Sequence, residues 1–223
     1  MEALAPVTVR LDAPGIAVGV VVAKGCGNGE SSRDLQQELR RATDAAVAAR
    51  ESAESAARKA AVRAMLRHGS YKPTGRGKPA SEYLLNAAAE GQFPFIGSLV
   101  DINNLVSVET LLPISLVDVA KAGARQYVVR FGRAGEDYVF NRSGQVLSLA
   151  DLLLLAREPG DLPCATPIKD SQATKTDETT TDVLGIVWAP ASLAAVARDA
   201  ARRMAGLIRA HCGAAEAQAG ELP

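Results

Sequence analysis

The sequence predicts a single domain of the α+β class, because strand-type and helix-type apolar patterns are interspersed along its 223 residues. Alternating or β-branched apolar runs predict strands at 7–11, 16–23, 127–131, 138–140 and 183–188. Apolar residues at helical spacing predict helices at 33–67, 81–90, 98–109 and 191–210. We expect strands and a long helix within residues 1–68, a core over about 70–190 and a C-terminal helix over 191–211.

Composition narrows the class of protein. Hydrophobic residues make up 48% and charged residues 22% of the chain, which is ordinary for a globular protein and excludes general disorder. The formal net charge is zero, so any contact with RNA must come from a local patch rather than from an overall field. The three cysteines, Cys26, Cys164 and Cys212, are odd in number, which suits a reducing compartment better than a disulfide framework. Neither these cysteines nor His68 and His211 have the spacing of a metal site. We predict a cytoplasmic protein without metal or cofactor.

Targeting and membrane segments are not expected. The N-terminal sequence MEALAPVTVRLD lacks the basic and apolar regions of a signal peptide. The apolar runs are also shorter than the roughly 18 residues that a membrane helix needs.

The predicted helix over 33–67 carries a seam of small residues. Ser31 or Ser32 would cap it, and Asp34 is favourable in its first turn. The seam has a period of about 3.5 and comprises Leu35, Leu39, Ala42, Ala46, Ala49, Ala53, Ala56 and Ala60. It indicates either close packing within the chain, which we favour, or a coiled coil with a partner.

The C-terminal part of the chain combines an amphipathic helix with a polar tail. The C-terminal helix has one apolar face and should cover a sheet. The residues after Cys212 are small and polar, and we expect them to fray.

A basic stretch covers residues 55–81, which contain seven cations and no carboxylate. They are Arg58, Lys59, Arg63, Arg67, Lys72, Arg76 and Lys78. Such a face suits a phosphate-bearing partner, or else it is a solvated helix face. The glycines of the loop over 71–79 expose backbone N–H groups beside Arg76 and Lys78, where an anion would fit. The loop lacks the GKS or GKT ending of a nucleotide-binding loop.

Two adjacent asparagines interrupt the apolar pattern of the helix over 98–109. Asn103 and Asn104 are poor helix formers, so at least one should face a pocket or bond to nearby backbone. The following residues, 112–123, predict a turn and a short helix.

Four blocks of this region resemble a known family. They read VDINNLVSVE, LPISLVD, VVRF and AGEDYVF, in the same order as in the B3/B4 module of the phenylalanyl-tRNA synthetase beta subunit. The resemblance covers about residues 70–190. The segments PTGRGKPASE and PIKDSQATKT are more similar to stand-alone B3/B4-domain proteins. The resemblance to the family implies an α+β fold of layered sheets. It also implies a role like that of the synthetase module, which removes by hydrolysis a tyrosine wrongly attached to the phenylalanine tRNA.

The resemblance carries over residue by residue. The Thr-Asn pair of the family's pocket falls on Asn103 and Asn104, so only the second position is kept. The family's histidine falls on Ser115, which would hydrogen-bond but not act as a base near neutral pH. The family's glycine-rich segment falls on residues 167–171, which here carry charges. The substrate would therefore differ from tyrosyl-tRNA.

The polar segment over 166–182 then becomes a predicted pocket wall. Lys169 would bind a phosphate or a carboxylate, and Asp170 would hold the substrate's amino group or orient a water molecule. Substrate-binding roles are also predicted for Arg76, Lys78, Asn103, Asn104, Ser115, Ser171, Thr174, Lys175 and Thr176. The alternative is that Lys169 and Asp170 form a surface ion pair contributing at most about 1 kcal/mol.

The resemblance implies a trans-acting hydrolase that removes the amino acid from mischarged aminoacyl-tRNA. Two alternatives stay open: a non-catalytic tRNA- or RNA-binding module, favoured by the loss of the histidine at Ser115, and a protein that binds free amino acids. The deacylase would depend on Lys169 and Asp170. The oligomeric state is open.

Overall fold

Two four-stranded sheets form the centre of the protein, whose computed structural model describes residues 6–222. Sheet A contains, in spatial order, β1 (Thr8–Leu11), β4 (Gln126–Phe131), β7 (Leu153–Glu158) and β8 (Leu162–Ala165). Sheet B contains, in spatial order, β10 (Glu216–Leu222), β2 (Ile16–Lys24), β9 (Val183–Pro190) and β3 (Ile114–Asp118). Strands β1 and β4 are parallel, and the other neighbouring strands of both sheets are antiparallel. The predicted domain runs from residue 1 to residue 223, and both of these positions lie outside the described residues.

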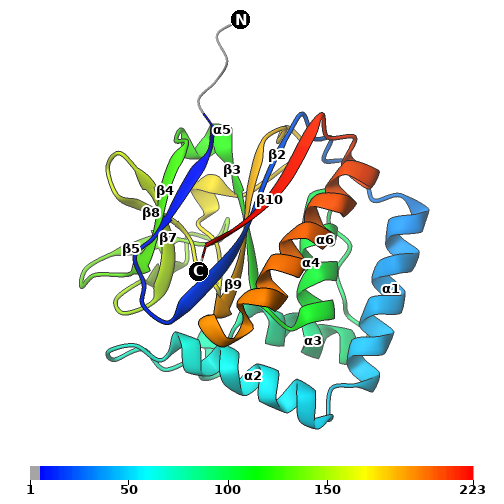
Figure 1. Cartoon of the computed structure of the whole chain (residues 1–223), viewed down its shortest axis with the longest axis horizontal. Coiled ribbons are helices and arrows are strands. Elements are labelled where there is room, and N and C mark those ends of the chain that lie inside the picture. The colour runs from blue at the N-terminus through cyan, green and yellow to red at the C-terminus, as the bar shows by residue number, and fades with distance from the viewer. Residues whose placement is uncertain (1–5, 223) are drawn as a thin grey trace, which may run out of the picture.

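The helices are α1 (Arg33–Ala48), α2 (Ala53–Leu66), α3 (Ala80–Ala89), α4 (Ser98–Thr110), α5 (Val119–Ala122) and α6 (Ala194–Cys212). Helices α1, α3, α4 and α6 lie on the side of sheet B away from sheet A, α2 runs along the lower end of the molecule, and α5 lies at its upper end beside β3 (Figure 1). Helix α6 packs on β2, β9 and β10, α4 packs on α6, and α1 packs on α4. A small hairpin of β5 (Asp137–Val139) and β6 (Val146–Ser148) lies near β8. The predicted α+β class with layered sheets is confirmed.

The predicted helix over 33–67 is in fact two helices, because a second helix start lies within it. The Ser32 hydroxyl caps α1 by accepting from the Leu35 N–H at 3.3 Å, and the Ser52 hydroxyl caps α2 by accepting from the Ser55 N–H at 3.1 Å. The seam packs within the chain only along α1, where Leu35 and Leu39 are fully buried. Along α2 the seam alanines are exposed, and the buried residues are Ser55, Val62, Met65 and Leu66.

Residues 112–123 form a strand before the short helix, which corrects the predicted turn. All five residues of β3 are buried, so the strand lacks the alternation that would reveal it in the sequence. The Asp118 carboxylate then caps α5 by accepting from the Lys121 N–H at 2.9 Å.

The C-terminal tail does not fray, contrary to the sequence prediction. Gly213 ends α6 in the left-handed conformation, and β10 then pairs with β2 along the edge of sheet B. Backbone hydrogen bonds, which do not depend on apolar side chains, hold this strand. Strands β6, β7 and β8 were not predicted; β7 begins with a fully buried LLLA run, which lacks the alternation of a half-buried strand. Within residues 6–222, no helix combines the length and apolarity needed to cross a bilayer.

The polar segment over 166–182 connects β8 of sheet A to β9 of sheet B and is bonded to the end of β3 and to α5. The Asp177 carboxylate accepts from the Lys121 ammonium at 2.6 Å, and the Thr180 hydroxyl donates to the Asp118 carboxylate at 2.6 Å. Its first residues lie where β3 and β8, the edge strands of the two sheets, come into contact.

Candidate functional site

An open pocket of about 560 Å³ lies between α3, α4 and residues 166–170, and we refer to it as the α3–α4 pocket. Its polar lining brings together five predicted site residues and one that the sequence analysis missed: Arg76, Asn103, Asn104, Lys169, Asp170 and Thr166. Its apolar lining consists of Ala80, Tyr83, Leu84, Ala87, Pro94, Ile114 and Ile168. The mixture of an apolar wall with a few polar groups is typical of small-molecule sites.

Thr166 shapes the wall of the pocket. Its hydroxyl donates to the Lys169 carbonyl at 2.8 Å and accepts from the Lys169 N–H at 3.1 Å. A threonine before proline favours such a turn, and this was the available sequence signal for the missed residue. The Ala80 N–H donates to the Pro167 carbonyl at 2.9 Å, which attaches the start of α3 to the wall.

Asp170 presents a partly buried carboxylate to the pocket. It accepts from the backbone N–H groups of Leu116 and Thr166, each at 3.3 Å. Burial raises the pKa of the Asp170 carboxyl to about 6, although the nearby Ser115 hydroxyl and the hydrogen bonds from the two backbone amides lower it. A carboxylate with such a pKa binds an ammonium group or a water molecule at pH 7 and exchanges protons near neutral pH.

The side chain of Lys169 is held apart from Asp170. Its ammonium lies 4.0 Å from the centre of the Phe140 ring, and its carbonyl accepts from the Tyr138 hydroxyl. No ion pair joins Lys169 to Asp170 among the described residues, so the surface ion pair of the alternative interpretation does not form. The Lys175 ammonium donates to the Phe140 carbonyl, and burial lowers its pKa while Asp170 opposes this effect.

The two asparagines lie side by side at the pocket on α4. The Asn103 side-chain N–H donates to the Asn104 side-chain oxygen at 3.3 Å. The Asn103 side-chain oxygen is buried and has no hydrogen-bond partner within the described residues. The expectation that one asparagine faces a pocket therefore holds for both.

The remaining predicted site residues lie outside the lining of this pocket. The Ser115 hydroxyl is buried, donates to the Thr166 carbonyl at 3.1 Å and accepts from the Trp188 indole N–H at 3.0 Å. Ser171 caps a short 3₁₀ helix, η2 (Gln172–Thr174), and the Thr174 hydroxyl donates to the Cys164 carbonyl at 3.1 Å. Thr176 lines a separate hollow near the start of α4, and Lys78, in the loop before α3, lines a hollow between α2 and α3.

We expect Ser115→Ala to destabilise the fold by about 1–3 kcal/mol, because it leaves the buried Trp188 N–H without an acceptor. Urea unfolding would measure the change, with Ser148→Ala on the exposed face of β6 as the matched control. Equal stability of both variants would mean that the Ser115 hydroxyl is dispensable to the wall.

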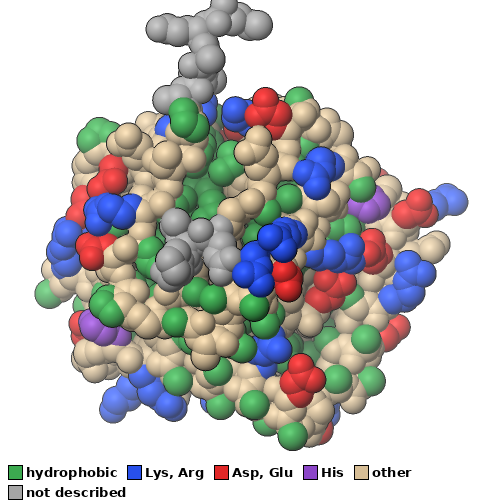
Figure 2. All heavy atoms as spheres, viewed as in Figure 1, with side chains coloured by type: hydrophobic (Ala, Val, Ile, Leu, Met, Phe, Trp, Pro, Cys, Tyr) green, Lys and Arg blue, Asp and Glu red, His purple; other side chains and the backbone are tan. Residues whose placement is uncertain are grey.

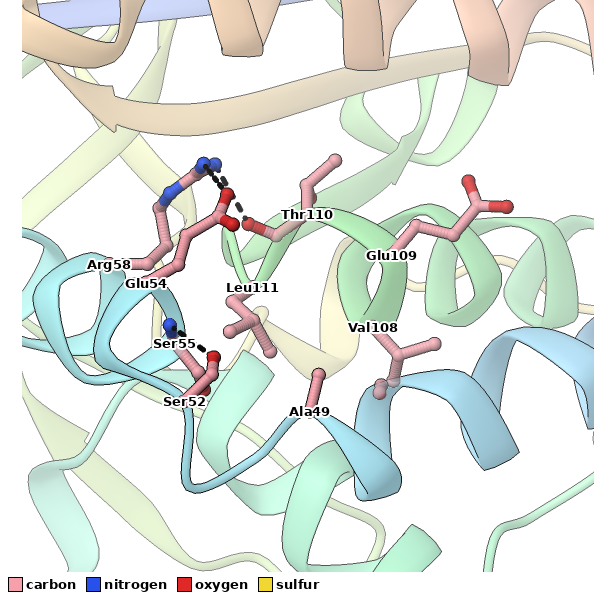
Figure 3. A pocket seen from close by; sticks show the side chains of 10 residues that line it. Ala49, Ser52, Glu54, Ser55, Arg58, Val108, Glu109, Thr110 and Leu111 are labelled. Carbon is pink, nitrogen blue, oxygen red and sulfur yellow. Dashed lines mark hydrogen bonds and ion pairs between the residues drawn. The ribbon is translucent and has the colours of Figure 1, made fainter.

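A second, smaller hollow of about 170 Å³ lies where α1, α2 and α4 meet (Figure 3). There the Arg58 guanidinium donates to the Thr110 carbonyl at 3.2 Å and pairs with the Glu54 carboxylate at 3.5 Å (Figure 3). It contains none of the predicted site residues, and its cation, Arg58, already has two partners, so the α3–α4 pocket is the candidate site. Across residues 6–222, His, Cys, Asp and Glu nowhere gather in a group of three or more that would hold a metal ion.

Comparisons with known proteins identify the family of this chain. The family model described as the B3/4 domain matches residues 74–213, which include the α3–α4 pocket. Among solved structures, an N-terminal fragment of the phenylalanyl-tRNA synthetase beta-subunit from Pyrococcus horikoshii is similar in fold, with a TM-score of 0.51 and 11% sequence identity. The match covers 98% of this chain and 55% of that one, so the chain spans about half of the fragment. No curated protein sequence matches. Because the family model covers more than half of its length, the chain belongs to the B3/4 domain family.

Proposed function

We propose that this protein is a trans-acting aminoacyl-tRNA deacylase, which hydrolyses the ester between an amino acid and the 3′ end of a tRNA. The observation that supports this most is the Asp170 carboxylate, with a pKa of about 6, in a largely apolar pocket of the B3/4 domain. The relative in the structural comparison is part of a tRNA synthetase subunit. The proposed place of action is the cytoplasm, where tRNA is charged.

The proposed roles follow from the pocket's chemistry. The apolar wall formed by Leu84, Ala87 and Ile168 receives the amino acid side chain. Asp170 holds the α-ammonium group or orients the attacking water. Lys169 and Arg76, at the pocket, neutralise the terminal phosphate. An aminoacyl ester is already activated, so orientation of one water molecule and of the substrate supplies much of the rate without a strong base.

A non-catalytic tRNA-binding module is the second candidate. The observation that favours it is the environment of Ser115, whose hydroxyl is buried and bonded to Trp188 and Thr166 instead of facing the substrate. A module of this kind would retain the uncleaved aminoacyl end in the same pocket.

Release of labelled amino acid from a panel of correctly and wrongly charged tRNAs tests the proposal. We expect release well above the spontaneous rate from at least one mischarged tRNA, without added metal or cofactor. Lack of release from every member, with tRNA retained on a filter at low salt, would reject the deacylase in favour of the binding module. Saturable binding of free amino acid without any tRNA binding would reject both.

A further inference from the structure

Four cations of the basic stretch have no hydrogen-bond or ion-pair partner for their side chains among the described residues. Among the described residues, the side chains of Arg67, Lys72, Arg76 and Lys78 have neither a hydrogen bond nor an ion pair to another residue. The other three cations are engaged: Arg58 with Glu54 and Thr110, Lys59 with the Arg50 carbonyl, and Arg63 with Glu82. Within the described part of this stretch, the cations without any side-chain partner are therefore confined to the end of α2 and the loop that follows it.

These cations border a groove that leads to the α3–α4 pocket. A hollow of about 510 Å³, the α2–α3 groove, is lined by Ala56, Lys59, Ala60, Arg63, Arg67, Lys78, Glu82, Leu85 and Asn86. Arg76 lines the α3–α4 pocket on the other face of α3, so residues 76–78 pass from one hollow to the other. Figure 2 shows Lys and Arg side chains gathered at the lower left, where Figure 1 places the loop after α2.

The loop carrying Arg76 and Lys78 is fixed by two tyrosines. The Tyr71 hydroxyl donates to the Gly77 carbonyl and the Tyr83 hydroxyl donates to the Gly75 carbonyl, each at 2.9 Å. Tyr83 also lines the pocket, and 41% of its surface is exposed. An exposed aromatic ring beside unpaired cations suits a single nucleic-acid strand, because bases stack on rings while cations neutralise phosphates.

A membrane surface fits this region less well. Phe95 and Ile96 are exposed apolar residues that directly follow Pro94 of the pocket lining, but they line a different hollow. That hollow also contains four acidic residues, Glu30, Asp101, Asp177 and Glu178, and one cation, Arg142. Its negative charge would repel the anionic lipids that the basic loop would attract.

We propose that the α2–α3 groove and the loop over residues 67–78 are the docking surface for the phosphodiester backbone of the tRNA's single-stranded 3′ segment. The strand runs along the groove past Arg67 and Lys78, crosses the loop at Arg76 and stacks its last base on Tyr83. The amino acid then enters the α3–α4 pocket. The direction of this path rests on the proposed function, but the docking surface itself is testable without catalysis.

Binding of deacylated tRNA, measured against salt concentration, tests the docking surface. Each phosphate contact to a single strand contributes about 0.7 to the slope of log K against log salt. We expect Arg67→Gln/Lys78→Gln to lower that slope by about 1.4 and to weaken binding at low salt roughly tenfold. The control, Arg41→Gln/Arg202→Gln, removes the same charge from exposed sites on α1 and α6 outside both hollows and should bind as the wild type.

Further arms separate this inference from the deacylase. A phosphate-free aminoacyl-adenosine ester should be hydrolysed equally by the wild type and by Arg67→Gln/Lys78→Gln. Salt-dependent tRNA binding that the variant loses would support the docking surface even without hydrolysis of any ester. Unchanged tRNA binding in the variant would overturn it even if the deacylase were active. Binding to phosphatidylserine vesicles that the variant loses, without tRNA binding, would overturn it in favour of a lipid surface.

Discussion

Asp170→Asn is expected to lower deacylation by at least about 100-fold, because it removes the negative charge that holds the ammonium group or orients the water. The substitution keeps the size of the side chain and an oxygen that accepts from Thr166 or Leu116. Single-turnover release from the best tRNA of the panel would measure the loss. Deacylated tRNA should bind to this variant as it does to the wild type, which shows that the substrate path is intact. Full activity in the variant would exclude Asp170 from catalysis.

The raised pKa of Asp170 predicts how the activity and the stability of the wild type change with pH. The wild-type deacylation rate, after subtraction of spontaneous hydrolysis, should rise as pH increases through about 6, because the carboxylate form of Asp170 is the active form. Stability should move in the opposite direction. The folded-state pKa is raised from 3.8, so protonation of Asp170 stabilises the fold fully below about pH 4, and this stabilisation is lost as pH rises through about 6.

The stability difference between wild type and Asp170→Asn should therefore shift by up to about 3 kcal/mol between pH 4 and 7. At pH 7 we expect the variant to be as stable as the wild type or more stable. Urea unfolding at several pH values would measure this. A difference that does not vary with pH would show that the Asp170 pKa is not raised.

Gly19→Ala is expected to destabilise the fold by about 3 kcal/mol or more, because α6 lies directly on this position of β2. A Cβ atom at Gly19 would lie 2.3 Å from the Ala197 carbonyl oxygen and 3.0 Å from the Ala201 Cβ atom. Both contacts are too close, and the first is to backbone, so the helix itself would have to move away from the sheet. Urea or thermal unfolding would measure the loss.

Gly206→Ala within α6 is the matched control. A Cβ atom there would meet no other atom within 4 Å, and alanine is the better helix former. We expect this variant to be more stable by about 0.5–1 kcal/mol. Comparable stability of the two glycine variants would contradict the close packing of α6 on β2.

Much of the fold was predictable because it depends on local patterns. The apolar alternation of β1, β4 and β5, and the helical spacing of α3, α4 and α6, were sufficient to place these elements. The errors arose where backbone pairing or capping overrides such patterns. Strand β3 is buried along its whole length, β10 is held by edge pairing, and Ser52 starts a second helix within the seam.

For the site, the residue types can be read from the sequence: a charged segment after β8, two asparagines on α4 and a basic loop before α3. Which of these residues share a pocket depends on how the sheets and helices pack against each other. Asp170 lies at the pocket because the edges of the two sheets meet there, and backbone N–H groups of Leu116 and Thr166 hold it. Ser115 and Thr174 are instead engaged within the wall, because a buried hydroxyl bonds to whichever partner the packing places beside it.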